Sequence, residues 1–390
     1  MADEQQQEKH QEDMAEALAQ QSQRLKRVAV AKPAVPTARP TAEEQRSRKE
    51  ERGIIEAHFQ VNMDRWAPLI AEHTIPTLAL PLTPADVRAL REHNTTHEQA
   101  QPTPEDASVL KELESRLDAL VAAVGGQDKG CFVKLSSRSP KDVTTKGDKF
   151  AAIYSSLLDQ RRRSDSSSAS SEEADKNARL GLLYRASTEA MRVHSAAEGI
   201  ALLLQSRRIY WDLTYFLALN DGLGAADDDD EDRERDNVDV GDLAIVVRPW
   251  ENIALQNEFR GFVHGGQFTA LSQYFTQLHF PELVERRSEL EQRIVAFWHR
   301  IQHAFAAYDK YVIDFAIVED DQGNEKMVVL ELNPFNISTG AALFSWESED
   351  DSDTLEGKRP FEFRVRQTPI AHTLRNKLAP EWRPLLFADQ

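Results

Sequence analysis

The sequence lacks most of the features that mark secreted, disulfide-bonded or membrane-spanning proteins. It has a single cysteine, Cys131, which excludes an internal disulfide and a cysteine-based zinc site. It has no continuous apolar run of the roughly 18 residues that a transmembrane helix requires. The first residues, MADEQQQEKHQED, are polar and lack the apolar segment of a signal peptide. These absences leave a cytosolic or a nuclear protein, and of the two we expect a cytoplasmic one.

Basic residues are also scarce relative to acidic ones. The chain has 47 Lys and Arg against 65 Asp and Glu, which gives a formal net charge of -18. A protein that binds nucleic acid non-specifically needs a surplus of Lys and Arg, and so does one that binds an anionic membrane surface. The charge balance argues against direct nucleic-acid or membrane partners.

What is present is enough apolar material for a core and a clear division of the chain. Hydrophobic residues make up 41% of the sequence. Residues 1–50 are polar and Pro-containing, and we expect a disordered tail there. Two biased stretches, 161–179 and 227–237, are expected to be disordered insertions. They interrupt an N-terminal part, 51–240, which precedes a C-terminal part, 241–390, and both mix helical and strand patterns.

Residues 310–335 predict a β-hairpin near the C-terminal end. KYVIDFAIV and KMVVLELNPF are β-branched or apolar runs, and the polar segment EDDQGNE separates them. If Val318 lies opposite Met327, then Asp314 lies opposite Glu331. Asn333 follows one step further along the same face as Glu331, because strand side chains alternate between faces.

Two facing carboxylates destabilise a sheet unless something neutralises them. Carboxylate and amide oxygens are the ligands that Mg²⁺ takes when it also binds water and phosphates. Asp314, Glu331 and Asn333 are therefore candidate magnesium ligands. The alternative is that both acids lie on a solvated face, and a slip of one residue in register would have that effect.

Two further strands carry basic candidates. CFVKL projects Lys134 beside the loop SSRSP, where a lysine can hold a phosphate or remain exposed to solvent. AIVV ends at Arg248 and Trp250. In EFRGFV, Glu258 and Arg260 share one face of a strand, either as an ordinary ion pair or as an acid and a base directed at a nucleotide.

Several segments together resemble the cell division cycle protein 123 family. They are FVKLSSRSPKD, VVRPWENI, EFRGFV, LSQY, YVIDFAIV, LELNPF and LFSWE, in the family's order. The resemblance implies an α+β, ATP-grasp-like fold. In that fold two subdomains, built of antiparallel sheets with flanking helices, clamp ATP and Mg²⁺ between them.

The resemblance also implies roles for the candidate residues. Lys134 would contact the phosphates, Arg248 and Trp250 would lie beside the nucleotide, and Glu258 and Arg260 would complete its site. Asp314, Glu331 and Asn333 would hold magnesium, and Asp314 would also bind the nucleotide complex. The implied role is to bind the gamma subunit of eukaryotic translation initiation factor 2 and promote assembly of that complex, with ATP bound and no catalytic residue assigned.

The sequence departs from the family pattern at two of these places. The lysine loop reads KLSSRSPKD where the family has a sequence closer to KLNWSSPKD, and Glu331 stands where the family usually has Asp. These departures identify a divergent member. One alternative function is that of an ATP-grasp enzyme, a carboxylate–amine ligase or a kinase, acting on an unknown acceptor. Another is that of a scaffold that binds no nucleotide.

Overall fold

The structure is a computed structural model, and it describes residues 42–97, 100–164, 171–220, 242–319, 322–374 and 378–387. Most of the expected N-terminal tail and the acidic stretch 227–237 lie outside the described residues. The tail boundary expected at residue 50 is wrong, because helix α2 spans Ala42–Gln60. Its last turns are tied to the fold, since Phe59 is fully buried in the core.

The insertion expected at 161–179 is largely helical. Helix α7, Gly147–Ser164, and helix α8, Glu172–Glu189, run into it from both sides, so only residues 165–170 lie outside the described part. Ser171 caps α8 by accepting a hydrogen bond from the Ala174 N–H. Arg161 pairs with Asp175 at 2.8 Å. Composition suggested disorder here because serine and charged residues are common in loops. In the structure, Ser171 caps one helix, and Arg161 and Asp175 link the two helices by an ion pair.

The first sheet has four antiparallel strands in the order β1-β4-β2-β3. These are β1, Leu78–Pro81; β2, Cys131–Leu135; β3, Arg192–Val193; and β4, Ala244–Pro249. Helices α4, Pro84–Glu92, α5, Pro104–Ala123, α9, Ala196–Gln205, and α10, Arg207–Asn220, share a buried apolar core with it. Both α4 and α5 begin with a Thr-Pro capping box, which fixes where each helix starts.

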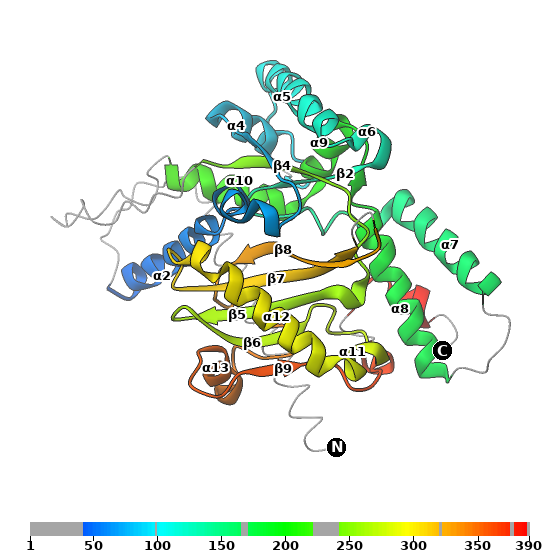
Figure 1. Ribbon diagram of the computed structural model, residues 1–390. Helices are drawn as coiled ribbons and strands as arrows, with labels where there is room; N and C mark the ends of the chain where they lie inside the picture. The colour runs from blue at the N-terminus through cyan, green and yellow to red at the C-terminus, as the bar shows by residue number, and fades with distance from the viewer. Residues whose placement is uncertain are drawn as a thin grey trace.

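The second sheet has five strands in the order β8-β7-β5-β6-β9. These are β5, Glu258–His264; β6, Gln267–Gln273; β7, Lys310–Glu319; β8, Glu325–Asn333; and β9, Glu362–Arg364. The pairings among β5, β6, β7 and β8 are antiparallel, as expected, and β9 adds one parallel pairing with β6 at the edge. Helix α12, Arg287–Ile301, crosses one face of the sheet (Figure 1) and buries Ile294 and Phe297 against it.

The short elements complete the chain. They are α3, Met63–Trp66; η1, Ala67–His73; α6, Gly126–Lys129; η2, Leu255–Asn257; α11, Pro281–Glu285; η3, Gln302–Phe305; α13, Glu349–Leu355; η4, Ala371–Leu374; and α14, Arg383–Phe387. A third apolar core joins α7 and α8 to η4 and α14. Within the described residues, no helix combines the length and the apolar character needed to cross a membrane.

From the sequence we expected the chain to divide into two parts at residue 240. The two sheets do not follow that division. Strand β4 lies in the first sheet, between β1 and β2. Conversely, Trp66 and Ile70, from the N-terminal part, are buried in the core of the second sheet. Composition changes mark loops, whereas strand pairing decides which sheet a segment joins. The chain therefore crosses between the sheets more than once.

Candidate functional site

The predicted hairpin is present as β7 and β8, and it contains a β-bulge. Near the turn, Ile317 lies opposite Met327, so the assumed pairing of Val318 with Met327 is wrong by one residue. Leu330 has no partner on β7, and beyond this extra residue Asp314 does lie opposite Glu331. The predicted facing pair is therefore confirmed, through a register that changes within the strand.

Asp314 is bound by a guanidinium from the neighbouring strand. Arg260 on β5 donates from Nε and Nη2 to the two carboxylate oxygens, each at 2.8 Å. Asn333 Nδ2 lies 3.1 Å from Asp314 Oδ2. The Asp314 side chain is 4% exposed, so this bidentate pair is almost entirely removed from water. The ion pair left open between Glu258 and Arg260 is not formed. Arg260 takes Asp314 because the two residues are directly opposite in the β5–β7 ladder.

Glu331 is bound by the lysine of the other sheet. Lys134 Nζ on β2 donates to Glu331 Oε1 on β8, and the pair links the two sheets. Lys134 is 1% exposed, so the alternative of a solvent-exposed lysine is wrong. Burial lowers the pKa of Lys134 although Glu331 opposes this effect. The pKa of Glu331 is lowered to about 2, because Lys134 and Lys141 outweigh the effect of burial.

Arg248 joins the two sheets behind this pair. It donates to Thr77 Oγ1 at 2.9 Å, to Thr74 Oγ1 at 3.1 Å and to the Leu330 carbonyl at 2.9 Å. Leu330 is the bulge residue next to Glu331. Burial lowers the pKa of Arg248 to about 10, and Glu331 partly offsets this. Arg248 is thus a buried cation that holds the bulge in place.

Trp250 lies away from this cluster. Its backbone N–H donates to the Gly130 carbonyl at 3.1 Å, its indole donates to Asn252 Oδ1, and the guanidinium of Arg192 lies 5.8 Å from its ring. Although only Pro249 separates it from Arg248, β4 ends at Pro249 and Trp250 lies beside Arg192 of β3. The structure therefore brings together Lys134, Arg248, Arg260, Asp314, Glu331 and Asn333 and leaves Trp250 apart from their contacts.

Glu258 carries an unusual carboxyl at the start of β5. Its side chain makes no hydrogen bond or ion pair with any described residue. Burial raises its pKa to about 7, with Asp314 and Glu331 adding to the shift and Lys141 and Arg260 opposing it. Lys141 Nζ donates to the Tyr274 hydroxyl at 2.9 Å. Among the carboxylates of this cluster, Glu258 is thus the one that no cation of the described residues contacts.

Sequence reasoning missed several charged neighbours. Arg138 contacts Asp212 at 3.0 Å, and His58 and Ser137 also bond this fully buried carboxylate. Arg208 lies in electrostatic range of Arg138, Glu331 and Asp212. Arg138 was visible as a departure from the family's lysine loop. Arg208 and Asp212 lie in the helical stretch SRRIYWDL, where nothing in the pattern distinguishes a site residue from a solvated one.

The donors for a magnesium ion are suitable in chemistry but are bonded to cations here. Both oxygens of Asp314 face Arg260, and Glu331 faces Lys134. Within the described part of the chain, no group of three or more His, Cys, Asp or Glu side chains is arranged to hold a metal. Glu258 is the additional carboxylate nearby. Magnesium ligation by Asp314, Glu331 and Asn333 remains a prediction, and it requires the two ion pairs to open.

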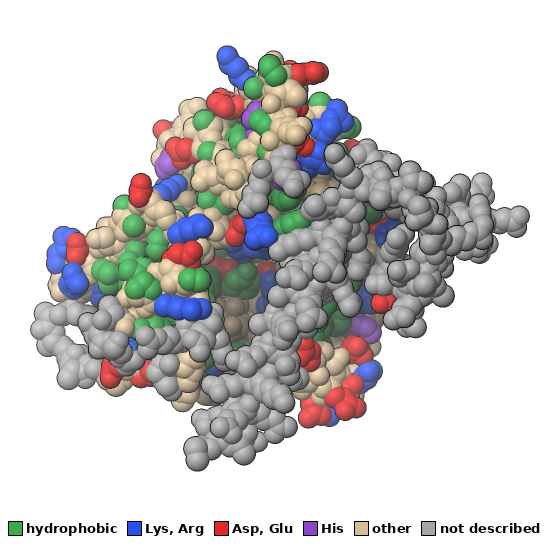
Figure 2. Space-filling model, turned by 180° about the vertical axis from the view of Figure 1, so that it is seen from behind, with side chains coloured by type: hydrophobic (Ala, Val, Ile, Leu, Met, Phe, Trp, Pro, Cys, Tyr) green, Lys and Arg blue, Asp and Glu red, His purple; other side chains and the backbone are tan. Residues whose placement is uncertain are grey.

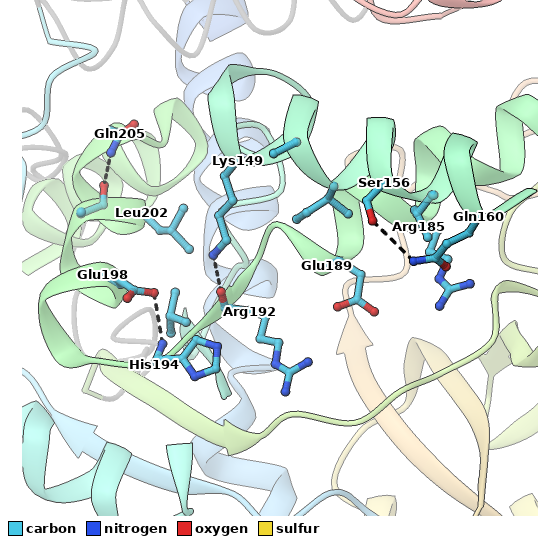
Figure 3. Close-up of a pocket in the computed structure, with 15 residues that line it drawn as sticks. Lys149, Ser156, Gln160, Arg185, Glu189, Arg192, His194, Glu198, Leu202 and Gln205 are labelled. Carbon is cyan, nitrogen blue, oxygen red and sulfur yellow. Dashed lines mark hydrogen bonds between the residues drawn. The ribbon is translucent and has the colours of Figure 1, made fainter. Parts of the chain in front are cut away.

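Two cavities lie outside this charged cluster. One, of about 810 Å³, is open to solvent and lined by residues of α7, α8, β3 and α9, with Leu202 among them (Figure 3). The other, of about 1160 Å³, lies beside the start of α10. None of the sequence-predicted site residues lines either one. On the face opposite the view of Figure 1, Figure 2 shows a hollow near the middle, with charged side chains around it. We take the inter-sheet cluster as the candidate site because it gathers buried ionisable groups with shifted pKa values, and such groups are common at functional sites.

Comparison with known proteins gives one family. The family model D123 matches residues 183–380. A protein of Dictyostelium discoideum named "Translation initiation factor eIF2 assembly protein" is 27% identical over 120 residues, which is 29% of this chain and 30% of that protein. A protein of the same name from Xenopus laevis is 31% identical, over 26% of this chain and 29% of its own length. These matches span under a third of each relative.

Matches that cover more of the chain have lower sequence identity. "Cell division cycle protein 123" of Aspergillus terreus is 23% identical over 72% of this chain and 60% of its own. The solved structure of Cdc123 from Schizosaccharomyces pombe is 17% identical, with a TM-score of 0.51, and the match covers 80% of this chain and 98% of that one. This likeness shows that the chain shares the fold of that structure, and it confirms the α+β class expected from the sequence.

Proposed function

The chain belongs to the D123 family, and from that premise we propose that it binds Mg·ATP between its two sheets and acts in the assembly of eukaryotic translation initiation factor 2. The relatives' names supply the assembly role. The gamma subunit as the contacted partner comes from the sequence resemblance. The nucleotide part of the proposal is supported by the charges of the inter-sheet cluster.

A local excess of positive charge is the observation on which the nucleotide proposal rests. Within a protein of net charge -18, basic groups outnumber carboxylates where the two sheets meet. The basic groups are Lys134, Arg138, Lys141, Arg208, Arg248 and Arg260, and the carboxylates are Asp212, Glu258, Asp314 and Glu331. A polyphosphate that brings a divalent cation would balance such a cluster, because phosphates attract the basic groups and the metal attracts the carboxylates.

The ion pairs suggest how the residues would divide these tasks. Lys134 and Arg260 hold Glu331 and Asp314 in the free protein. On binding, the two cations would turn to phosphate oxygens, and the released carboxylates with Asn333 would hold Mg²⁺, which neutralises phosphate charge. Arg248 would stay in place, because its three hydrogen bonds belong to the frame of the site. The exchange conserves the number of charge pairs, so little buried charge is left uncompensated.

An enzyme is the second candidate, and Glu258 favours it. A carboxyl whose pKa is near 7 suits a general base at neutral pH. In an ATP-grasp ligase or kinase it would accept a proton from an acceptor group. Steady ADP release that depends on a small-molecule acceptor, and that is lost in Glu258→Gln, would select this function over assembly alone.

Calorimetry with Mg·ATP tests the nucleotide proposal. We expect Asp314→Ala to lose most of its affinity for Mg·ATP. Asp314→Asn keeps an oxygen for Arg260 and guards against simple unfolding, and it should also bind weakly. Asp350→Ala, on exposed α13, is the matched control and should bind as the wild type does. Equal affinity in all four proteins would remove the metal site from the proposal.

A pull-down tests the partner separately. The wild type should retain the purified gamma subunit of translation initiation factor 2, and addition of Mg·ATP should change the amount retained. Absence of retention both with and without nucleotide would contradict the assembly role. It would leave the nucleotide site untouched, because the calorimetry reports on that site alone.

A further inference from the structure

Arg208 occupies the first turn of α10, where a loop carboxylate fixes the helix start. Asp142 accepts hydrogen bonds from the Ser206 hydroxyl at 2.5 Å and from the backbone N–H groups of Arg207 at 2.8 Å and Arg208 at 3.3 Å. Asp142 directly follows Lys141 in the chain. The cap therefore brings the segment that carries Lys141 against the turn that carries Arg208. The helix terminus itself is satisfied, so any anion here is held by side chains.

Three of the six cations named in the inter-sheet cluster already have a carboxylate. Lys134 pairs with Glu331, Arg260 with Asp314 and Arg138 with Asp212. The guanidinium of Arg208 has no hydrogen bond or ion pair with any described residue. Lys141 has no carboxylate within ion-pair distance among these residues, and its Nζ donates to the Tyr274 hydroxyl at 2.9 Å. Arg248 also lacks a carboxylate, but its three side-chain nitrogens donate hydrogen bonds to Thr74, Thr77 and the Leu330 carbonyl. Among the described cations of the cluster, Arg208 and Lys141 are therefore the two that keep free donors for an anion.

The surroundings of Arg208 make a guanidinium without a bonded anion energetically unfavourable. Its side chain is half-buried, and the neighbouring guanidinium of Arg138 repels it. Burial and Arg138 lower the pKa of Arg208, while Glu331, Tyr274 and Asp212 oppose the shift from a distance. A partly desolvated cation without a bonded anion is unfavourable, and an oxyanion with two or more acceptor oxygens would relieve it.

We propose that Arg208 and Lys141 form an oxyanion subsite that binds a phosphate group without first opening any ion pair and without metal. The inference rests on the proposed function in placing this group within the same site. The oxyanion comes either from the terminal phosphate of the nucleotide or from a phosphate or carboxylate of a second substrate. In both cases the planar guanidinium of Arg208 supplies paired donors, and Lys141 adds a point charge.

Inorganic phosphate is the probe that tests the subsite, with magnesium and nucleotide absent. We expect phosphate to raise the thermal unfolding temperature of the wild type and to bind Arg208→Gln at least tenfold more weakly. Arg207→Gln is the matched control, because it removes the same charge from the adjacent exposed position. Arg208→Lys should recover part of the binding. Phosphate binding that is unchanged in Arg208→Gln, or lost equally in Arg207→Gln, would overturn the subsite.

Nucleotides then identify the source of the oxyanion. If Arg208→Gln weakens binding of Mg·ATP but leaves Mg·ADP unchanged, the subsite takes the terminal phosphate. If instead phosphate still binds the wild-type Mg·ATP complex and fails to bind that of Arg208→Gln, it takes a second substrate. Either result supports the subsite. A wild type that binds phosphate through Arg208 and never binds Mg·ATP would refute the proposed function and leave the subsite standing.

Discussion

The Nη1 atom of Arg248 donates a hydrogen bond to the carbonyl oxygen of Leu330 at 2.9 Å. Arg248 belongs to β4 in the first sheet, and Leu330 is the unpaired bulge residue of β8 in the second. Thr74, which also accepts from Arg248, donates to the Val329 carbonyl at 2.7 Å. The bulge that sets Glu331 opposite Asp314 is therefore held by Arg248 of the other sheet and by Thr74 of the segment before β1.

The first prediction concerns Arg248→Met. This change removes three donors and leaves the Leu330 carbonyl and two threonine hydroxyls without them, so we expect unfolding to become easier by about 3 kcal/mol. Arg248→Lys keeps the charge but cannot reach three acceptors at once, so it should recover less than half of the loss. Urea unfolding of both variants measures this. A lysine variant as stable as the wild type would show that charge, and not the fork of donors, holds the bulge.

The second prediction concerns the pair of Lys134 and Glu331. Glu331→Gln leaves a buried ammonium without its carboxylate and should cost about 3 kcal/mol, whereas Lys134→Met together with Glu331→Gln should cost less, because the desolvated charge has gone. A double-mutant cycle measured by urea unfolding at pH 7 gives the coupling. Additive losses in the cycle would contradict a direct interaction.

The same pair predicts an acid response. The folded pKa of Glu331, about 2, lies below its ordinary value of 4.5. Its stabilising contribution is therefore fully present above about pH 4.5 and is lost as the pH falls towards 2. Lys134→Met should flatten the pH dependence of the unfolding free energy in this window. A variant with the full acid slope of the wild type would show that other carboxylates produce it.

The third prediction concerns Glu258, whose pKa shift has the opposite sign. Its folded pKa of about 7 exceeds the ordinary 4.5, so the folded protein binds the proton more tightly than the unfolded chain. Stability should therefore fall as the pH rises from about 4.5 to 7. Glu258→Gln should be about 3 kcal/mol more stable than the wild type at pH 8 and equal to it at pH 4. The exposed Glu112→Gln is the control, and a pH-independent gain for Glu258→Gln would contradict the shift.

How far the sequence predicted the site depends on which forces place each residue. The sequence predicted that Asp314 and Glu331 face each other with Asn333 further along the same strand, and the structure has this arrangement only because a bulge compensates for a wrong register at the turn. The bulge at Leu330 could not be predicted from the sequence, because VVLELN is an uninterrupted strand pattern. The hydrogen bond that holds the bulge comes from Arg248 of another sheet. The pairing assumed at the turn was wrong by one residue, and the bulge then restored the expected facing pair.

Contacts between distant segments explain the other differences. Alternation put Glu258 and Arg260 on one face, but the cross-strand neighbour Asp314 takes the guanidinium. Trp250 follows Arg248 closely in sequence and leaves its site because the strand ends between them. Arg208 lies on helix α10, whose sequence pattern predicts only which face is buried. Its position beside the other cations depends on how α10 packs against the first sheet.

The last prediction compares one substitution at two glycines. In Gly261→Ala the added Cβ would meet Phe268 Cζ at 2.8 Å and Phe315 Cε2 at 3.0 Å, and overpacking of this kind costs about 1–3 kcal/mol. In Gly181→Ala the Cβ enters open space inside α8, so stability should rise by about 0.5–1 kcal/mol. Because Gly261 adjoins Arg260 on β5, its displacement should also weaken Mg·ATP binding, whereas Gly181→Ala should leave binding unchanged. Chemical denaturation and calorimetry on both variants test this, and changes of the same sign in stability would contradict the close packing at Gly261.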